Sequence, residues 1–213
     1  MIISTKHKYI FIANPKTGTT SIQSFLLEND PLAKNYHVVL NNKSYSFKEH
    51  DTAAKIKKTL GDEYNNYKTF GFVRNPMAKR VSGYHFLNNG KPITEGHKGP
   101  RWPILTKIWF AKLLPFKLWN LLYPVKTNKE YFTDEQGNVI VDRIYIFENI
   151  EEDFEKALKF IGMYEDNVKL PYKNRSKHKK YNKYFNNKIY NYIVKIINYK
   201  DIEFYNECVK NVK

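Results

Sequence analysis

Tyr9-Ile-Phe-Ile-Ala13 is a continuous run of apolar, β-branched and aromatic residues, and the polar stretch Asn14-Pro15-Lys16-Thr17-Gly18 follows it directly. Such a run is typical of a buried strand. Beyond Gly18, the apolar residues Ile22, Phe25 and Leu26 recur at the spacing of one helix face. The sequence therefore predicts a strand, a tight turn and a helix in succession.

The same alternation recurs further along the chain. Thr69-Phe-Gly-Phe-Val73 is a second apolar run, and Pro76 beyond it suits the first position of a helix. Arg143-Ile-Tyr-Ile-Phe147 is a third, and the helix predicted after it ends at Gly162. Strands that alternate with helices favour an α/β fold with a parallel sheet. We expect a single domain over residues 1–213, with a P-loop-like, three-layer architecture in which helices flank a central parallel sheet.

Two further segments complete the pattern. Residues 51–61 predict another helix, with Asp51 as its N-terminal cap and Gly61 as its stop, so His50 would lie just before a helix N-terminus. Residues 90–129 are rich in proline and are the least regular part of the chain. We expect them to form an irregular insertion in the domain.

The basic charge is concentrated in two segments. The chain carries 36 Lys and Arg against 21 Asp and Glu, a net charge of +15. Residues 96–129 hold seven basic residues and no acidic one, and residues 167–200 hold ten and none. Such segments favour an anionic partner, which leaves nucleic acid, acidic polysaccharide, a membrane surface and a phosphorylated cofactor open. Because the cations are nearly all lysine, compositional bias explains the excess equally well.

Cysteine content and hydropathy indicate the cellular compartment and the relation of the chain to membranes. Cys208 is the only cysteine, which excludes an internal disulfide and suits a reducing cytoplasm. No run approaches the roughly 20 apolar residues of a membrane span. Residues 102–125 are apolar, but Lys107, Lys112 and Lys117 would be distributed around a helix. The sequence predicts a cytoplasmic protein with neither a transmembrane segment nor a clean interfacial helix, and leaves peripheral membrane contact and the oligomeric state open.

The turn after the first strand has the composition of an anion-binding loop. Gly18 lets the backbone approach a ligand closely, and the N–H groups at the start of the next helix face an anion. A plain tight turn would not need a lysine and a run of hydroxyls: Lys16, Thr17, Thr19, Thr20 and Ser21. The Walker A pattern of nucleoside triphosphatases is not met, because it ends in Gly-Lys-Ser/Thr whereas Lys16 precedes the glycine here.

A second polar cluster follows the second strand. Arg74 stands at its carboxyl end, the edge where ligands of open α/β sheets bind. Ser82 lies two helical turns into the following helix, and we expect both side chains to reach one phosphate. For Arg80, two residues before Ser82, a solvated helix face is the favoured interpretation.

Together the two clusters resemble the sulfotransferases that use 3′-phosphoadenosine 5′-phosphosulfate (PAPS). Pro15-Lys16-Thr17-Gly18-Thr19-Thr20-Ser21 is similar to their 5′-phosphosulfate loop, and Phe72-Val73-Arg74-Asn75-Pro76 with Ser82-Gly83-Tyr84 is similar to their 3′-phosphate motif. The resemblance covers most of the chain except about residues 91–128 and is closest to the carbohydrate-acting branch, including short bacterial relatives. It implies in-line transfer of a sulfuryl group to a carbohydrate hydroxyl, with adenosine 3′,5′-bisphosphate as the product and no metal.

The resemblance also assigns roles to residues that bind the donor. Lys16 would lie beside the bridging oxygen, and residues 17–21 would hold the 5′-phosphate. The 3′-phosphate would be held by two side chains and by a loop that closes over it: Arg74 and Ser82, with Ser176 and Lys179 on the loop.

The general base is a histidine in this scheme. His50 matches in position the histidine that related polysaccharide enzymes use, and a helix N-terminus disfavours the imidazolium, which keeps the ring available as a proton acceptor. Adjacent Asp51 would oppose that effect. His85 is the rival candidate, although packing within a helix explains it as well.

Residues 90–129 would form the acceptor side, because aromatic faces stack on sugar rings and lysines suit an acidic glycan. Core packing explains the tryptophans equally well: Trp102, Trp109 and Trp119. Two other functions stay open, a P-loop-type ATP-dependent small-molecule kinase and a basic nucleic-acid-binding protein. The missing Gly-Lys-Ser/Thr order argues against the first, and the charge of +15 alone would give only unspecific binding to nucleic acid.

Overall fold

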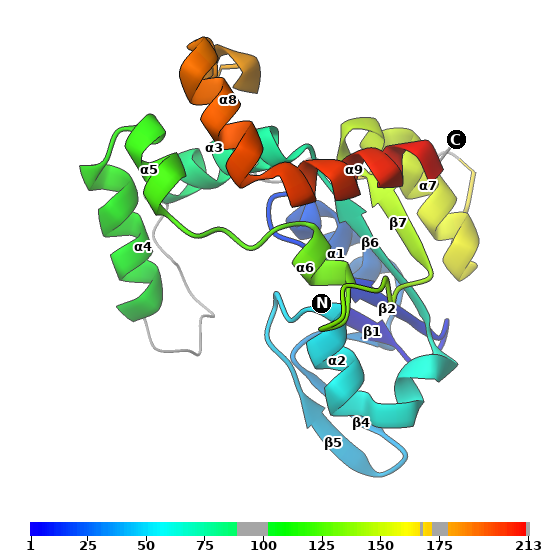
Figure 1. Ribbon diagram of the computed structural model, residues 1–213. Coiled ribbons are helices and arrows are strands. Elements are labelled where there is room, and N and C mark those ends of the chain that lie inside the picture. Colours follow the sequence, from blue (N-terminus) through cyan, green and yellow to red (C-terminus); the bar gives the residue numbers. More distant parts are fainter. Residues whose placement is uncertain (89–101, 167, 172–178, 212–213) are drawn as a thin grey trace. The chain divides into compact units, whose positions relative to one another are not determined.

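The computed structural model describes residues 1–88, 102–166, 168–171 and 179–211 (Figure 1). The chain divides into two compact units. The first comprises Met1–Asn75, Lys126–Asn174 and Lys200–Lys213, and the second comprises Pro76–Val125 and Arg175–Tyr199. Each unit contains a hydrophobic core of its own.

A five-stranded sheet forms the centre of the first unit, in the order β3-β1-β2-β6-β7. Its strands are β1 (Ile2–Ser4), β2 (Tyr9–Ile12), β3 (Ala33–Lys34), β6 (Lys68–Val73) and β7 (Arg143–Ile146). β2, β6 and β7 are parallel, as the sequence predicts, and the α/β class is confirmed. The prediction of a parallel sheet does not hold on one side of the sheet, where β1 is antiparallel to both β2 and β3. The turn of residues 5–8 between β1 and β2 is too short for a parallel crossover.

Helices cover both faces of this sheet. Ile10 and Ile12 of β2 enter one core cluster, together with residues of α2 (Ala53–Leu60) and α9 (Tyr199–Asn211). Tyr9 and Phe11 enter the other, with residues of α1 (Thr19–Asn29) and α7 (Ile150–Ile161). Because strand side chains alternate between faces, the continuous apolar run of β2 supplies both cores.

Shorter elements connect these layers. They are the hairpin β4 (His37–Leu40) and β5 (Lys43–Ser46), the helix α6 (Lys129–Phe132), and the 3₁₀ helices η1 (Gly61–Asn66) and η2 (Phe147–Asn149). The start of α2 differs from the prediction, because its N-cap is Thr52, whose hydroxyl accepts from the N–H of Lys55 at 3.3 Å. The Asp51 carboxylate instead accepts from the N–H of Lys48 at 2.8 Å and closes the turn that contains His50.

The second unit is helical in the residues that the structure describes. Its elements are α3 (Pro76–Asn88), α4 (Trp102–Leu113), α5 (Phe116–Leu122), η3 (Tyr181–Tyr184) and α8 (Lys188–Ile197). The expectation of an irregular insertion over residues 90–129 is therefore wrong for α4 and α5. Pro103 falls in the first turn of α4 and Pro115 is the N-cap of α5, and proline is tolerated at both positions.

The helices were also compared with the length and hydropathy of a membrane span. Within the described ranges, no helix combines the length and the apolar character needed to cross a bilayer.

Trp119 of α5 is the largest fully buried side chain in the second unit, where it stacks on Tyr123. We expect Trp119→Ala to lower the free energy of unfolding by about 3–5 kcal/mol, because the truncation leaves a large cavity. The neighbouring Leu118 is 48% exposed, so Leu118→Ala should cost less than about 0.5 kcal/mol. Urea denaturation followed by circular dichroism measures both, and equal losses would contradict the assigned core.

Candidate active site

The loop between β2 and α1 has a strained backbone. Lys16 has a φ of +67° and Gly18 a φ of +75°, and only glycine adopts such values without cost. A Cβ atom on Gly18 would also lie 2.7 Å from Cδ1 of Ile150 and 3.3 Å from the ring of Phe147. Gly18 is therefore required both for the turn and for the close approach of η2 and α7.

The N-terminus of α1 lies directly behind this loop. Gly18 is its N-cap, and the carbonyl of Gly18 accepts from the N–H groups of Ser21 and Ile22 at 3.0 and 3.1 Å. No acidic residue stands in the first turn, so the positive end of the helix is not compensated from within. This is the arrangement that binds anions in many α/β proteins.

The hydroxyl residues predicted to hold a phosphate differ in their surroundings. Thr17 is fully buried, and its hydroxyl donates to the carbonyl of Asn14 at 2.7 Å, which fixes the shape of the loop. Thr19 and Ser21 are buried at the start of α1, whereas Thr20 is exposed.

Arg74 joins the second cluster to the first. It follows β6, and its Nη1 donates to the carbonyl of Lys16 at 2.9 Å. Its guanidinium lies over the ring of Phe147, 4.4 Å from the centroid, while its buried Nε has no hydrogen-bond partner among the described residues. Burial lowers the pKa of Arg74, and the nearby charge of Glu148 opposes this shift. The site thus holds a half-buried cation whose buried Nε can still donate a hydrogen bond.

Lys16 is the second cation of the site. Burial, and to a smaller extent the charge of Arg74, lower the pKa of its ammonium from 10.5 to about 8. The side chain is therefore mainly cationic at neutral pH but loses its proton about two pH units below an ordinary lysine.

His50 lies against the start of the same loop. Its Nδ1 is 2.8 Å from the carbonyl oxygen of Ala13, and because a carbonyl can only accept, Nδ1 carries the proton. Burial lowers the pKa of His50, with the charge of Lys16 adding to the effect and Glu49 and the Ala13 carbonyl opposing it. The neutral ring therefore presents Nε2 as a proton acceptor. Nε2 is 3.9 Å from Oε1 of Glu49, which can stabilise an imidazolium once formed.

Asn128 connects the two loops and gives no signal in the sequence. Its fully buried Oδ1 accepts from Nδ2 of Asn14 at 2.9 Å and from the N–H of Arg74 at 3.3 Å. Its Nδ2 donates to the carbonyl of Arg74 at 2.9 Å and to Oδ2 of Asp201 at 3.2 Å. Asn14 donates in addition to the carbonyl of Phe72 at 3.0 Å. We call Asn14, Asn128 and Asp201 the amide clamp, because they hold the carboxyl ends of β2 and β6 together.

Glu148 fixes a third strand end to the same place. It belongs to η2, directly after β7, and its Oε1 accepts from the N–H of Asn75 at 2.9 Å. Its Oε2 accepts from the hydroxyl of Tyr205 at 3.0 Å. The carboxyl ends of β2, β6 and β7 therefore meet around Lys16, Arg74 and Phe147, as expected for the ligand edge of a parallel sheet.

The other predicted site residues belong to the second unit. Ser82 is buried in α3, and Lys179 is exposed before η3. Nε2 of His85 lies 2.7 Å from the hydroxyl of Tyr184. Ser176 lies outside the described residues.

The interpretation of Arg80 as a solvated side chain is wrong. Arg80 is buried in the second unit, where its Nη2 donates to the carbonyl of Tyr123 at 3.1 Å and its Nε to Oδ1 of Asn120. Its spacing on α3 could not distinguish a solvated face from a face covered by α5.

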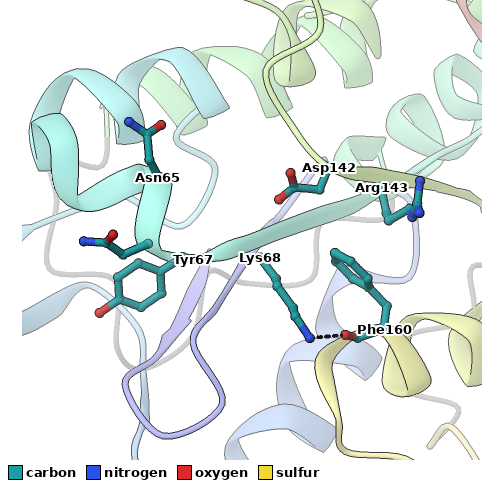
Figure 2. A pocket seen from close by; sticks show the side chains of 7 residues that line it. Asn65, Tyr67, Lys68, Asp142, Arg143 and Phe160 are labelled. Atoms are coloured by element: carbon teal, nitrogen blue, oxygen red, sulfur yellow. Dashed lines mark hydrogen bonds between the residues drawn. The ribbon is translucent and has the colours of Figure 1, made fainter.

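A separate open pocket of about 430 Å³ lies elsewhere in the first unit (Figure 2). It is lined by Asn65, Asn66, Tyr67, Lys68, Asp142, Arg143 and Phe160. Lys68 and Arg143 begin β6 and β7, so the pocket is at the amino ends of the strands, away from the Lys16 loop. Nζ of Lys68 donates to the carbonyl of Phe160 at 2.9 Å, and Asp142 accepts from Thr69 at 2.7 and 2.8 Å, so these charged groups already have partners.

Comparison with known proteins agrees with the geometry of the first unit. The model of the sulfotransferase family matches residues 1–109, about half of the chain, and the chain belongs to this family. An uncharacterised protein of Archaeoglobus fulgidus is 32% identical over 114 residues, which cover 52% of this chain and 82% of that protein. No solved structure gives a significant match. The family match contains Lys16, His50 and Arg74, whereas Asn128 and Phe147 lie beyond it.

Removal of the Asn128 side chain should destabilise the first unit. Asn128→Ala removes the side-chain hydrogen bonds that buried Asn128 makes to Asn14, Arg74 and Asp201, and we expect a loss of about 2–3 kcal/mol in the free energy of unfolding. Asn128→Asp should cost at least as much, because a carboxylate would face Asp201. Chemical denaturation measures both. Asn65→Ala, at an exposed position, is the control, and a loss equal to that control would disprove the clamp.

Proposed function

We propose that this member of the sulfotransferase family transfers the sulfuryl group of PAPS to a hydroxyl of a carbohydrate acceptor by in-line displacement. The observation that carries the proposal is the meeting of Lys16, Arg74 and His50 at one loop, at the carboxyl ends of parallel strands. Two cations can bind an anionic donor, and a neutral histidine beside them can act as the proton acceptor.

The loop fits the 5′-phosphate of the donor. The strained backbone of Lys16, the left-handed turn at Gly18 and the uncompensated N-terminus of α1 all favour an anion at this position. Residues 17–21 would surround it, with Thr17 shaping the loop and the residues at the start of α1 supplying donors.

Lys16 and His50 would divide the chemistry between them. The donor supplies a sulfuryl group that is joined to the 5′-phosphate through a bridging oxygen, which gains negative charge as the bond breaks. The ammonium of Lys16 would offset this charge. Nε2 of His50 would take the proton of the acceptor hydroxyl, and Glu49, 3.9 Å away, would stabilise the resulting imidazolium.

The remaining assignments are predictions from the family resemblance. Arg74 and Ser82 would hold the 3′-phosphate, with Ser176 and Lys179 on the loop that closes over it. For the acceptor, Trp109 is 59% exposed and free to stack on a sugar ring, whereas Trp119 is fully buried and serves the core. Lysines of α4 and α5 would suit an acidic glycan.

A transfer assay with labelled PAPS across a panel of glycans tests the function. We expect Lys16→Ala and His50→Ala to reduce turnover about 100-fold or more, because each removes a group that acts on the reacting atoms. His50→Ala should keep its affinity for adenosine 3′,5′-bisphosphate, measured by calorimetry. His37→Ala, at an exposed histidine of β4, is the matched control.

Three results would contradict the proposal. They are normal turnover of His50→Ala, absence of transfer to every glycan in the panel, and magnesium-dependent binding of ATP in place of the bisphosphate, which would favour a kinase.

The pKa of Lys16 predicts a pH dependence of binding. Because this pKa is lowered to about 8 in the free protein, the cation is present below pH 8 and lost above it. The Kd for adenosine 3′,5′-bisphosphate should rise above pH 8, by up to about tenfold per pH unit. Lys16→Arg stays charged throughout and should bind with a nearly constant Kd from pH 7 to about 9.5. Calorimetry across this range compares the two proteins, and identical profiles would show that Lys16 does not carry the effect.

A further inference from the structure

Helix α8 in the second unit has an exposed apolar face. Ile189, Tyr192, Ile193, Ile196 and Ile197 follow the i, i+3, i+4, i+7, i+8 pattern of one helix side, and each is 40–73% exposed. We call these five residues the α8 stripe. Most of the exposed large hydrophobic side chains in the described part of the chain belong to this unit.

The stripe is not needed to fold the helix onto its unit. Tyr190 and Val194, one turn apart on another side of α8, already enter the core that α3, α4 and α5 share. Contiguous apolar surface of this kind is rare on soluble monomers and usually marks a contact with a partner.

The charges beside the stripe define the partner. Lys188 and Lys195 belong to α8, and Lys180 and Lys183 precede it, all exposed. The described residues of the second unit include no aspartate or glutamate. The complementary surface is therefore apolar and anionic.

We propose that the α8 stripe docks peripherally on an anionic lipid bilayer. Isoleucine side chains would enter the acyl boundary, Tyr192 would lie at the headgroup level, and the lysines would reach the lipid phosphates. A second copy of the chain fits less well, because symmetric pairing of two stripes would bring lysines against lysines. This inference is independent of the transfer reaction.

Co-sedimentation with vesicles tests the docking. Wild type should bind phosphatidylcholine vesicles that contain phosphatidylglycerol and should bind pure phosphatidylcholine far more weakly. Ile193→Glu/Ile197→Glu should weaken binding to the anionic vesicles at least about tenfold, since it removes apolar contacts and adds negative charge. Lys188→Glu/Lys195→Glu should also weaken it, and more so at low salt than at high salt.

Matched substitutions in the first unit separate docking from unspecific attraction. Lys55→Glu/Lys58→Glu changes the charge equally on the exposed side of α2, and Leu32→Glu/Val39→Glu changes two exposed apolar residues. Both double variants should bind anionic vesicles with nearly the affinity of wild type. Circular dichroism and light scattering follow the fold and oligomeric state. The docking proposal is overturned if Ile193→Glu/Ile197→Glu binds anionic vesicles as tightly as wild type, or if the first-unit controls lose as much binding as this variant does. It is also overturned if wild type is a dimer and Ile193→Glu/Ile197→Glu is a monomer.

Discussion

The amide clamp is the interaction on which the candidate site depends. Lys16 and Arg74 are both cationic, and the charge of Arg74 lowers the pKa of Lys16, so their proximity opposes folding. Hydrogen bonds from Asn128 to both loops, and from Asn128 to Asp201, hold the strand ends together against that repulsion. In the part of the chain that the structure describes, the same geometry leaves Nε of Arg74 without a partner. A bound anion would relieve the repulsion and satisfy that donor, which is the expected behaviour of a preorganised anion site.

Local sequence patterns were sufficient for the parts of the site that are built from local structure. The apolar runs of β2, β6 and β7 alternate with helices, and their carboxyl ends share one edge because parallel strands share a direction. Lys16, Gly18 and Arg74 could be placed there from their positions after these runs. The same patterns place His50 just before a helix, where the structure also has it, although Thr52 and not Asp51 caps that helix.

Long-range contacts account for what the sequence could not predict. Asn128 lies in an unremarkable Lys-Thr-Asn-Lys stretch, and its partner Asn14 is 114 residues away, so no period or motif connects them. Strands β1 and β3 are short, and the antiparallel direction of β1 follows from the length of its turn to β2 more than from pattern. Arg80 shows the limit of helical periodicity, which does not reveal that α5 covers its face of α3.

A crystal structure of the complex with adenosine 3′,5′-bisphosphate would show whether the loop after β2 is the phosphate site. We expect the 5′-phosphate to lie against the backbone of residues 17–21, within hydrogen-bond distance of Nζ of Lys16. Density for the 5′-phosphate away from this loop, with Lys16 and Arg74 both turned from the nucleotide, would contradict it.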